Sequence, residues 1–157
     1  MKLAAHEALL PRDWLAAFRR YVGVTAAGHL AWETAHVPLY RIWQEGSAAQ
    51  IAFAIVHCSG GDLLIALSAL VGALLLAGSP GWPTERGRGV AALTLAFGVA
   101  YTFYSEWLNV SVRGSWSYTE VMPVLPPLGT GLSPILQWLV VPSVALAAAS
   151  RGRGNTP

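Results

Sequence analysis

The sequence predicts an all-α fold: an integral membrane bundle of four transmembrane helices, preceded by a short interfacial amphipathic helix. The chain of 157 residues is 54% hydrophobic and only 11% charged, so polar residues are too few to coat a soluble globule. Its apolar residues come in long blocks, and a run of about 18 or more is typical of a membrane-spanning helix. The basic residues lie mostly at the ends of these blocks, as membrane topology requires.

Four blocks are predicted to span a membrane, at about 21–43, 49–77, 89–112 and 132–149, and together they define a transmembrane domain of residues 21–149. In the preceding segment 1–20, Leu10, Trp14 and Phe18 share one helical face, which fits a helix lying at the interface. The segments 78–89 and 113–131 are rich in Gly and Pro and are predicted to be loops. Residues 150–157 form a polar tail.

The distribution of charge predicts the orientation. Eight of the ten Lys and Arg residues precede the first span, separate the second from the third, or follow the fourth, and only Arg41 and Arg113 lie on the other side. The positive-inside rule then places both termini, and with them the tail, in the cytoplasm of a multi-pass protein of the cell (inner) membrane. Because the basic residues form no cluster on a soluble face, we expect no nucleic-acid partner.

Small and aromatic residues indicate how the spans pack and where they end. Small residues recur every fourth position in two spans, which favours close helix packing. Aromatic residues near span ends are expected to anchor the protein at the membrane interface. The first set is Ala69, Ala73, Ala77 and Ala92, Ala96, Ala100, and the second is Tyr21, Trp43, Trp82, Trp107 and Trp116. A homodimer is compatible with these features.

The first span carries ionisable residues in the stretch GHLAWETAHVPLY, residues 28–40. Offsets of four, seven and eleven residues return to one face of an α-helix. His29, Glu33, His36 and Tyr40 therefore share a face that we expect to point into the bundle. Pro38 removes a backbone hydrogen bond and should loosen or kink the helix beside them.

The second span places Asp62 near its midpoint, within VHCSGGD. An ionised carboxylate at that depth costs about 2.5–3.5 kcal/mol on insertion scales. His57 and Asp62 lie about 140° apart on an ideal helix. Either Gly60 and Gly61 distort the helix, or the two residues serve different neighbours.

The third and fourth spans add further polar groups. Thr102, Glu106, Asn109 and Arg113 form a second polar stripe, in which Glu106 could pair with Arg113. In the fourth span we expect Ser133 to cap the helix N-terminus, Pro134 to occupy its first turn and Gln137 to point inward.

Given the predicted orientation, seven polar groups lie between mid-membrane and the outer face, namely His36, Tyr40, His57, Asp62, Glu106, Asn109 and Gln137. The loop 113–131, which bears Trp116, Tyr118 and Glu120, lies on the same side. The sequence therefore predicts a polar pocket in the outer half of the bundle, capped by a Pro-rich loop. Ionisable residues at this depth usually mark function. The catalytic candidates are His29, Glu33, His36, Asp62 and Glu106, and the pocket candidates include Tyr40, His57, Asn109 and Gln137.

The order of motifs resembles the EXPERA group, which includes emopamil-binding sterol isomerases, and the chain is also similar to small four-helix bacterial membrane proteins of undescribed function. The resemblance covers about residues 25–145. It rests on HLxxE at 29–33, on the acid at Asp62, on Tyr101 and Glu106 in the third span, and on Gln137-Trp138 followed by Pro142. The group has Glu where this chain has Asp62, and Asn before the final Trp where this chain has Gln137.

The resemblance implies a lipid-facing cavity in which His and carboxyl groups pass protons to and from a buried apolar substrate, such as a lipid or isoprenoid. By position, His29 and Glu33 would be the acid and base, Asp62 and Glu106 would stabilise charge, and Tyr101 and Trp138 would join the pocket. The partners would be membrane lipid and an apolar small molecule. No cofactor is required by this interpretation, and none is identified.

Two alternatives remain open from the sequence. His29, Glu33 and His36 on one helical face, with His57 or Glu106 from neighbouring spans, offer nitrogen and oxygen ligands for a transition metal, for transport or catalysis. The polar groups could instead join helices in an accessory subunit of a membrane complex. Interhelical hydrogen bonds in membranes contribute only about 0.6 kcal/mol on average, which is small beside the cost of burying Asp62.

Overall fold

The computed structural model describes residues 14–151 and confirms the all-α class. In chain order its elements are α1 (Trp14–His36), the 3-10 turn η1 (Val37–Leu39), α2 (Ile42–Glu45), α3 (Ala48–Ala77), α4 (Gly87–Glu106), the π-helical turn η2 (Trp107–Val112), β1 (Val124–Leu125), β2 (Thr130–Gly131) and α5 (Leu132–Ser150). The two strands form a small antiparallel hairpin in which Val124 faces Gly131.

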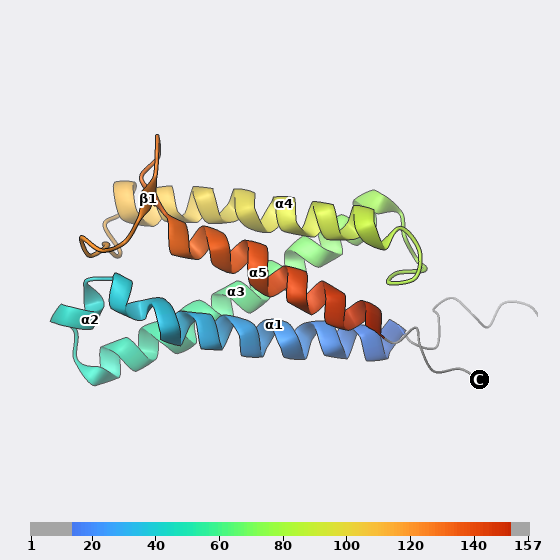
Figure 1. Cartoon of the computed structure of the whole chain (residues 1–157), viewed down its shortest axis with the longest axis horizontal. Helices are drawn as coiled ribbons and strands as arrows, with labels where there is room; N and C mark the ends of the chain where they lie inside the picture. Colours follow the sequence, from blue (N-terminus) through green and yellow to red (C-terminus); the bar gives the residue numbers. More distant parts are fainter. Residues whose placement is uncertain (1–13, 152–157) are drawn as a thin grey trace, which may run out of the picture.

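The four long helices form one bundle (Figure 1), in which α1 and α4 each pack against both α3 and α5. The start of α1, the α3–α4 loop and the end of α5 lie at one end of the bundle. The opposite end carries α2, the β1–β2 hairpin and the C-terminal end of α4. We call these the terminal end and the hairpin end.

Local sequence explains where the helices end. α1 stops at His36 because Val37 precedes a proline and so disfavours helical geometry. Pro38 lies within the 3-10 turn that begins at Val37 and does not kink a continuing helix. α3 starts with a capping box between Ser47 and Gln50 and stops at Gly78, whose φ of 55° suits a residue without a side chain. Between these caps, α3 continues through Gly60 and Gly61 without a break.

The predicted interfacial helix covers residues 9–20, and its first five residues lie outside the described part of the chain, as do the tail residues 152–157. Residues 14–20 form the first turns of α1, which continues unbroken into the first predicted span. The predicted cap of α5 was wrong. The residue at the N-cap is Gly131 and no side chain caps the helix, because Ser133 uses its hydroxyl on α1.

Within residues 14–151, two helices are long and apolar enough to cross a membrane, α3 with a mean hydropathy of 2.1 and α5 with 1.7. The other two long helices carry more polar groups. α1 contains two arginines, Glu33 and two histidines, and α4 contains Arg88 and Glu106.

The bundle exposes large apolar side chains on α3 and buries several polar side chains between its helices. Only 22% of the most apolar window of α3 is buried, and large side chains such as Phe53, Leu64 and Leu75 are 68%, 67% and 77% exposed. His29, Glu33 and Gln137 are buried. A soluble protein rarely exposes contiguous apolar surface of this extent, so the outer face of α3 needs an apolar neighbour.

The apolar core occupies the terminal end of the bundle. It contains Ala17, Tyr21, Leu70, Ala73, Trp82, Val90, Ala145, Leu146 and Ala149. Of the two predicted small-residue rows, Ala69 and Ala73 are buried between helices, whereas Ala92, Ala96 and Ala100 face outward. Of the aromatic residues predicted to anchor the protein at a membrane interface, Trp43 and Trp107 are exposed, whereas Tyr21 and Trp82 are buried in the core.

Candidate functional site

One face of α1 carries a row of buried polar side chains. Thr25 and His29 are fully buried, and Glu33 and His36 are 9% and 6% exposed. They follow each other at intervals of four, four and three residues, which keeps them on the face that packs against the bundle. The row runs from mid-helix to the hairpin end, away from the apolar core.

Gln137 of α5 joins this row to α3. Its amide nitrogen Nε2 lies 3.0 Å from Glu33 Oε1, 2.9 Å from Asp62 Oδ2 and 2.9 Å from His29 Nδ1. Asp62 Oδ2 is also 3.3 Å from His29 Nδ1. Residues from α1, α3 and α5 therefore converge on one amide group, and we call His29, Glu33, Asp62 and Gln137 the junction.

The Gln137 amide has fewer hydrogens than the atoms around it could accept. An amide nitrogen carries two hydrogens, but three acceptor atoms surround this one. The distances are compatible with both states of His29 Nδ1, acceptor or donor. In one, His29 Nδ1 accepts from Gln137, which then has one hydrogen left for the two carboxyl groups. In the other, His29 Nδ1 carries a proton and donates it to Asp62, which frees Gln137 for both carboxyl groups.

His36 extends the junction toward the hairpin end. Its Nε2 lies 3.1 Å from Glu33 Oε2, and its Nδ1 lies 3.0 Å from Ser133 Oγ. Trp32 Nε1 also donates to Ser133 Oγ, at 3.2 Å. The Ser133 hydroxyl thus fixes both the His36 ring and the Trp32 indole.

Trp138 fixes the His29 ring from the α5 side, with ring centroids 5.1 Å apart. Gly98 of α4 lies beneath Trp138, and any side chain at that position would overlap the indole. The glycine lets α4 approach closely enough to hold Trp138 in place. His29 Nε2 has no hydrogen-bond partner in the described chain.

A second polar contact lies next to the junction. Tyr118, in the loop 113–131, donates its hydroxyl hydrogen to Glu106 Oε2 and accepts a hydrogen bond from the Gly131 amide at 2.9 Å. Burial raises the pKa of the Tyr118 phenol above its ordinary value, and the Glu106 carboxylate raises it further. The phenol therefore keeps its proton and remains a donor to Glu106.

Tyr40 connects the two polar groups. Its ring packs edge-on against the His36 ring, with ring centroids 5.2 Å apart, and against the Tyr118 ring, with ring centroids 5.4 Å apart. The backbone is tied at the same place, because the Thr119 amide donates to the Leu39 carbonyl at 2.9 Å. The loop 113–131 is thereby held over the end of α1, above His36.

Three predicted pocket residues lie apart from this site. His57 is exposed on α3, where it stacks on Phe53. Since α3 is regular, His57 and Asp62 face different neighbours, which was the second of the two expectations. Tyr101 is 44% exposed beside Tyr104, and Asn109 donates to the Ser105 carbonyl of its own helix. Glu106 takes Tyr118 as its partner, not Arg113.

The predicted metal ligands are not arranged around a common point. Within residues 14–151, no three His, Cys, Asp or Glu side chains are placed to hold a metal ion. The contacts show why: His36 is used on Glu33 and Ser133, while His29 Nδ1 is directed at Gln137 and Asp62.

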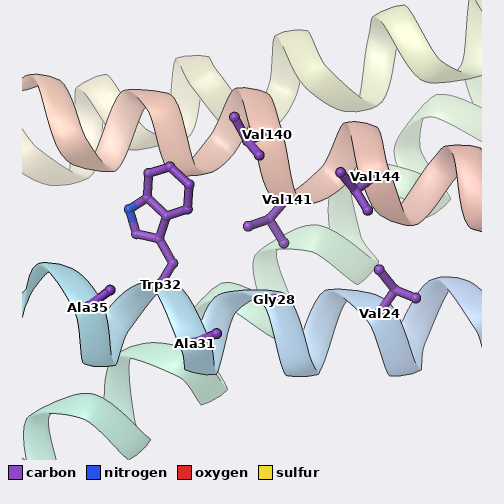
Figure 2. A pocket seen from close by; sticks show the side chains of 8 residues that line it. All are labelled: Val24, Gly28, Ala31, Trp32, Ala35, Val140, Val141 and Val144. Atoms are coloured by element: carbon purple, nitrogen blue, oxygen red, sulfur yellow. The ribbon is translucent and has the colours of Figure 1, made fainter.

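An apolar groove of about 310 Å³ lies beside the site, between α1 and α5 (Figure 2). Trp32, Gly28 and Val141 lie along it, with small and branched aliphatic side chains around them. The two helices come close together at Gly28, where an added Cβ would lie 2.8 Å from Val141. Trp32 belongs to both regions, since its ring lines the groove and its nitrogen contacts Ser133.

The fold and the site together define a helical bundle with a buried His, carboxyl and amide junction, in which two helices of residues 14–151 are long and apolar enough to cross a membrane. Comparison with protein-family models, with curated proteins and with solved structures finds no match for this chain.

Sequence reasoning did not anticipate the roles of Trp32 and Ser133, and it placed Tyr118 only in the capping loop. Ser133 precedes a proline at a helix start, where an N-cap is the usual assignment. Trp32 was not among the residues assigned to the polar face of the first span. Its position beside Glu33 was the available signal, since an indole nitrogen near a polar row usually finds a partner.

Proposed function

We propose that this is a four-span membrane protein whose junction acts as an acid–base centre on an apolar ligand of the membrane, a lipid or isoprenoid. The observation that carries the proposal is the convergence of His29 and Glu33 from α1, and of Asp62 from α3, on the Gln137 amide of α5. Burying such groups costs stability, and polar groups at membrane depth are usually retained for function.

Several features support the four-span arrangement. α1 has 23 residues and α4 has 20, and a helix of 20 residues is about 30 Å long, the thickness of a bilayer core. The outward faces of α3 and α5 are apolar. Of the seven arginines in the described chain, five lie at the terminal end and two at the hairpin end. The positive-inside rule then puts the terminal end in the cytoplasm and the junction in the outer half.

The two proton arrangements of the junction support acid–base chemistry. In the second arrangement the Nδ1 proton of His29 is directed at Asp62 Oδ2, 3.3 Å away, so it can move to that carboxylate while Gln137 remains a donor to Glu33. A ligand that gives up or takes a proton at the junction would then exchange it with His29 or Asp62 with little rearrangement. Double-bond isomerisation needs this property. One group donates a proton to an alkene carbon and another removes a proton from an adjacent carbon, so the double bond shifts with no net gain or loss of protons or electrons.

The α1–α5 groove supports an apolar ligand. Its walls are aliphatic apart from the Trp32 indole, whose N–H is already donated to Ser133. A hydrocarbon chain from the surrounding membrane loses no hydrogen bonds on entering it. Trp32 and Ser133 separate the groove from His36, so rotation of the indole would open a path between ligand and site.

Solvent-derived deuterium provides the test. The full-length protein in mild detergent is incubated in D₂O with the neutral and polar lipids extracted from its own membranes, and the lipids are analysed by mass spectrometry. We expect one lipid species to gain carbon-bound deuterium or a shifted double bond. His29→Ala and Glu33→Gln should abolish the change, because each removes one junction group.

His57→Ala is the matched control, since it removes a histidine of the same bundle that is exposed and outside the junction. Full incorporation by His57→Ala together with loss in both junction variants supports the proposal. Equal incorporation by all four proteins, or none by the wild type, contradicts the acid–base function. A lipid that co-purifies only with junction-intact protein but takes up no deuterium would reduce the function to binding.

A further inference from the structure

A second cavity lies at the terminal end, far from the junction. It is a cleft of about 590 Å³ between the α3–α4 loop, the start of α4 and the end of α5. Its mouth is basic and polar, with Arg86, Arg88 and Ser150, and its interior is apolar, with Trp82, Leu95 and Leu146. Among residues 14–151 no acidic side chain lines it, and the nearby Glu85 lies against Gly81 of the loop.

The backbone at the mouth is also electropositive. α4 begins at Gly87 with no side-chain cap and no acidic residue in its first turn. The amide N–H groups of Gly87, Arg88 and Gly89 have no acceptor within the described chain, and they add to the positive end of the helix dipole. At Gly87 and Gly89, no atom from another segment lies within 4 Å of the position that a Cβ would take, so a ligand can approach the backbone there.

The two arginines differ in availability. Arg86 donates from a guanidinium nitrogen to the Ala77 carbonyl at 2.6 Å, so one of its groups holds the end of α3. Arg88 is exposed and forms no ion pair within residues 14–151. Positive charges at the positive end of a helix repel it, unless an anion lies between them. The mouth of the cleft is therefore complementary to an anion.

We propose that this cleft binds an anionic phospholipid, with its phosphate between Arg88 and the first turn of α4 and an acyl chain between α4 and α5. The charge of the mouth selects the phosphate, and the apolar floor selects a hydrocarbon chain. The proposal rests on the membrane insertion proposed above but not on the junction, which lies at the other end of the bundle.

The test compares phosphatidylglycerol with phosphatidylcholine of identical chains, bound to the full-length protein in detergent and measured by native mass spectrometry. We expect phosphatidylglycerol to bind more tightly, and Arg88→Gln to weaken it roughly fivefold, since a basic residue near a lipid surface contributes about 1 kcal/mol. Arg113→Gln is the matched control, because Arg113 is also exposed and unpaired in the described chain but lies at the hairpin end. It should leave the affinity unchanged.

A second variant tests the apolar half of the cleft. Ala147 is exposed on α5 and lines the cleft, so Ala147→Phe should exclude the acyl chain without disturbing the core. It should weaken phosphatidylglycerol binding as well. Equal affinities for the two lipids, or an Arg88→Gln protein that binds like wild type, would overturn the proposal. So would inorganic phosphate that binds as tightly as phosphatidylglycerol and is unaffected by Ala147→Phe.

Discussion

The two ends of the bundle are built from opposite kinds of side chain. At the terminal end, α1, α3 and α5 pack through Ala17, Ala73, Ala145 and Ala149 around Leu70 and Trp82. Toward the hairpin end, the same helices meet through His29, Glu33, Asp62 and Gln137. The helices are continuous through both regions, so the difference lies in the buried side chains and not in the fold.

This contrast separates what holds the bundle together from what we propose it does. Small apolar side chains let membrane helices approach closely and gain dispersion energy at no desolvation cost. Burial of carboxyl, imidazole and amide groups carries a desolvation cost, which their hydrogen bonds offset only while every partner is present. We therefore expect stability to depend mainly on the terminal end and activity on the junction.

The largest expected effect is at the terminal end. Leu70 is 1% exposed in the apolar core, and Leu70→Ala should lower the free energy of unfolding by about 2–5 kcal/mol through lost contacts and a cavity. Denaturation of the purified protein in mixed micelles measures it. Leu64→Ala, at an exposed position on the same helix, is the control and should cost far less.

Gln137→Leu should have the next largest effect on stability and a complete effect on activity. It removes the donor shared by Glu33 and Asp62 and leaves both carboxyl groups without that partner, at a cost of about 1–3 kcal/mol. Deuterium incorporation should disappear with it. A Gln137→Leu protein as active as wild type would mean that the junction is not the reacting site.

Tyr118→Phe should loosen the loop 113–131. It removes the hydroxyl that joins Glu106 to the Gly131 amide, at a cost of about 1 kcal/mol. Hydrogen exchange should rise at Gly131 and Thr119 while the α1–α3 region stays protected. Unchanged exchange in the loop would show that the backbone bonds near Leu39 hold it without Tyr118.

The smallest expected effect is at His57. Because its ring is exposed and only stacks on Phe53, His57→Ala should change the free energy of unfolding by less than about 0.5 kcal/mol. If His57→Ala lowered the free energy of unfolding as much as Gln137→Leu, histidines outside the junction would matter to stability as much as the junction itself.

The sequence predicted the all-α class and the polar face of α1 because both follow from periodicity. Positions 29, 33 and 36 share a face on any α-helix, and that face is buried here. The 140° separation of His57 and Asp62 likewise predicted that a regular helix would send them to different neighbours, as α3 does.

Contacts between distant segments could not be predicted in this way. Whether Ser133 caps its own helix or bonds to Trp32 and His36 depends on how α1 and α5 pack, and one hydroxyl serves either role equally well. Trp82 near a helix end fits an interfacial anchor by sequence, yet the α3–α4 loop folds it into the core. In both cases tertiary packing selects between two locally acceptable roles.

The most direct test of the account replaces the whole junction at once, by His29→Leu, Glu33→Met, Asp62→Leu and Gln137→Met, and measures the free energy of unfolding. Replacing a buried polar network with apolar residues of similar volume is often neutral or stabilising. The account predicts a folded bundle at least as stable as wild type that no longer incorporates deuterium into lipid. A loss of several kcal/mol would contradict it, because the junction would then be what holds this end of the bundle together.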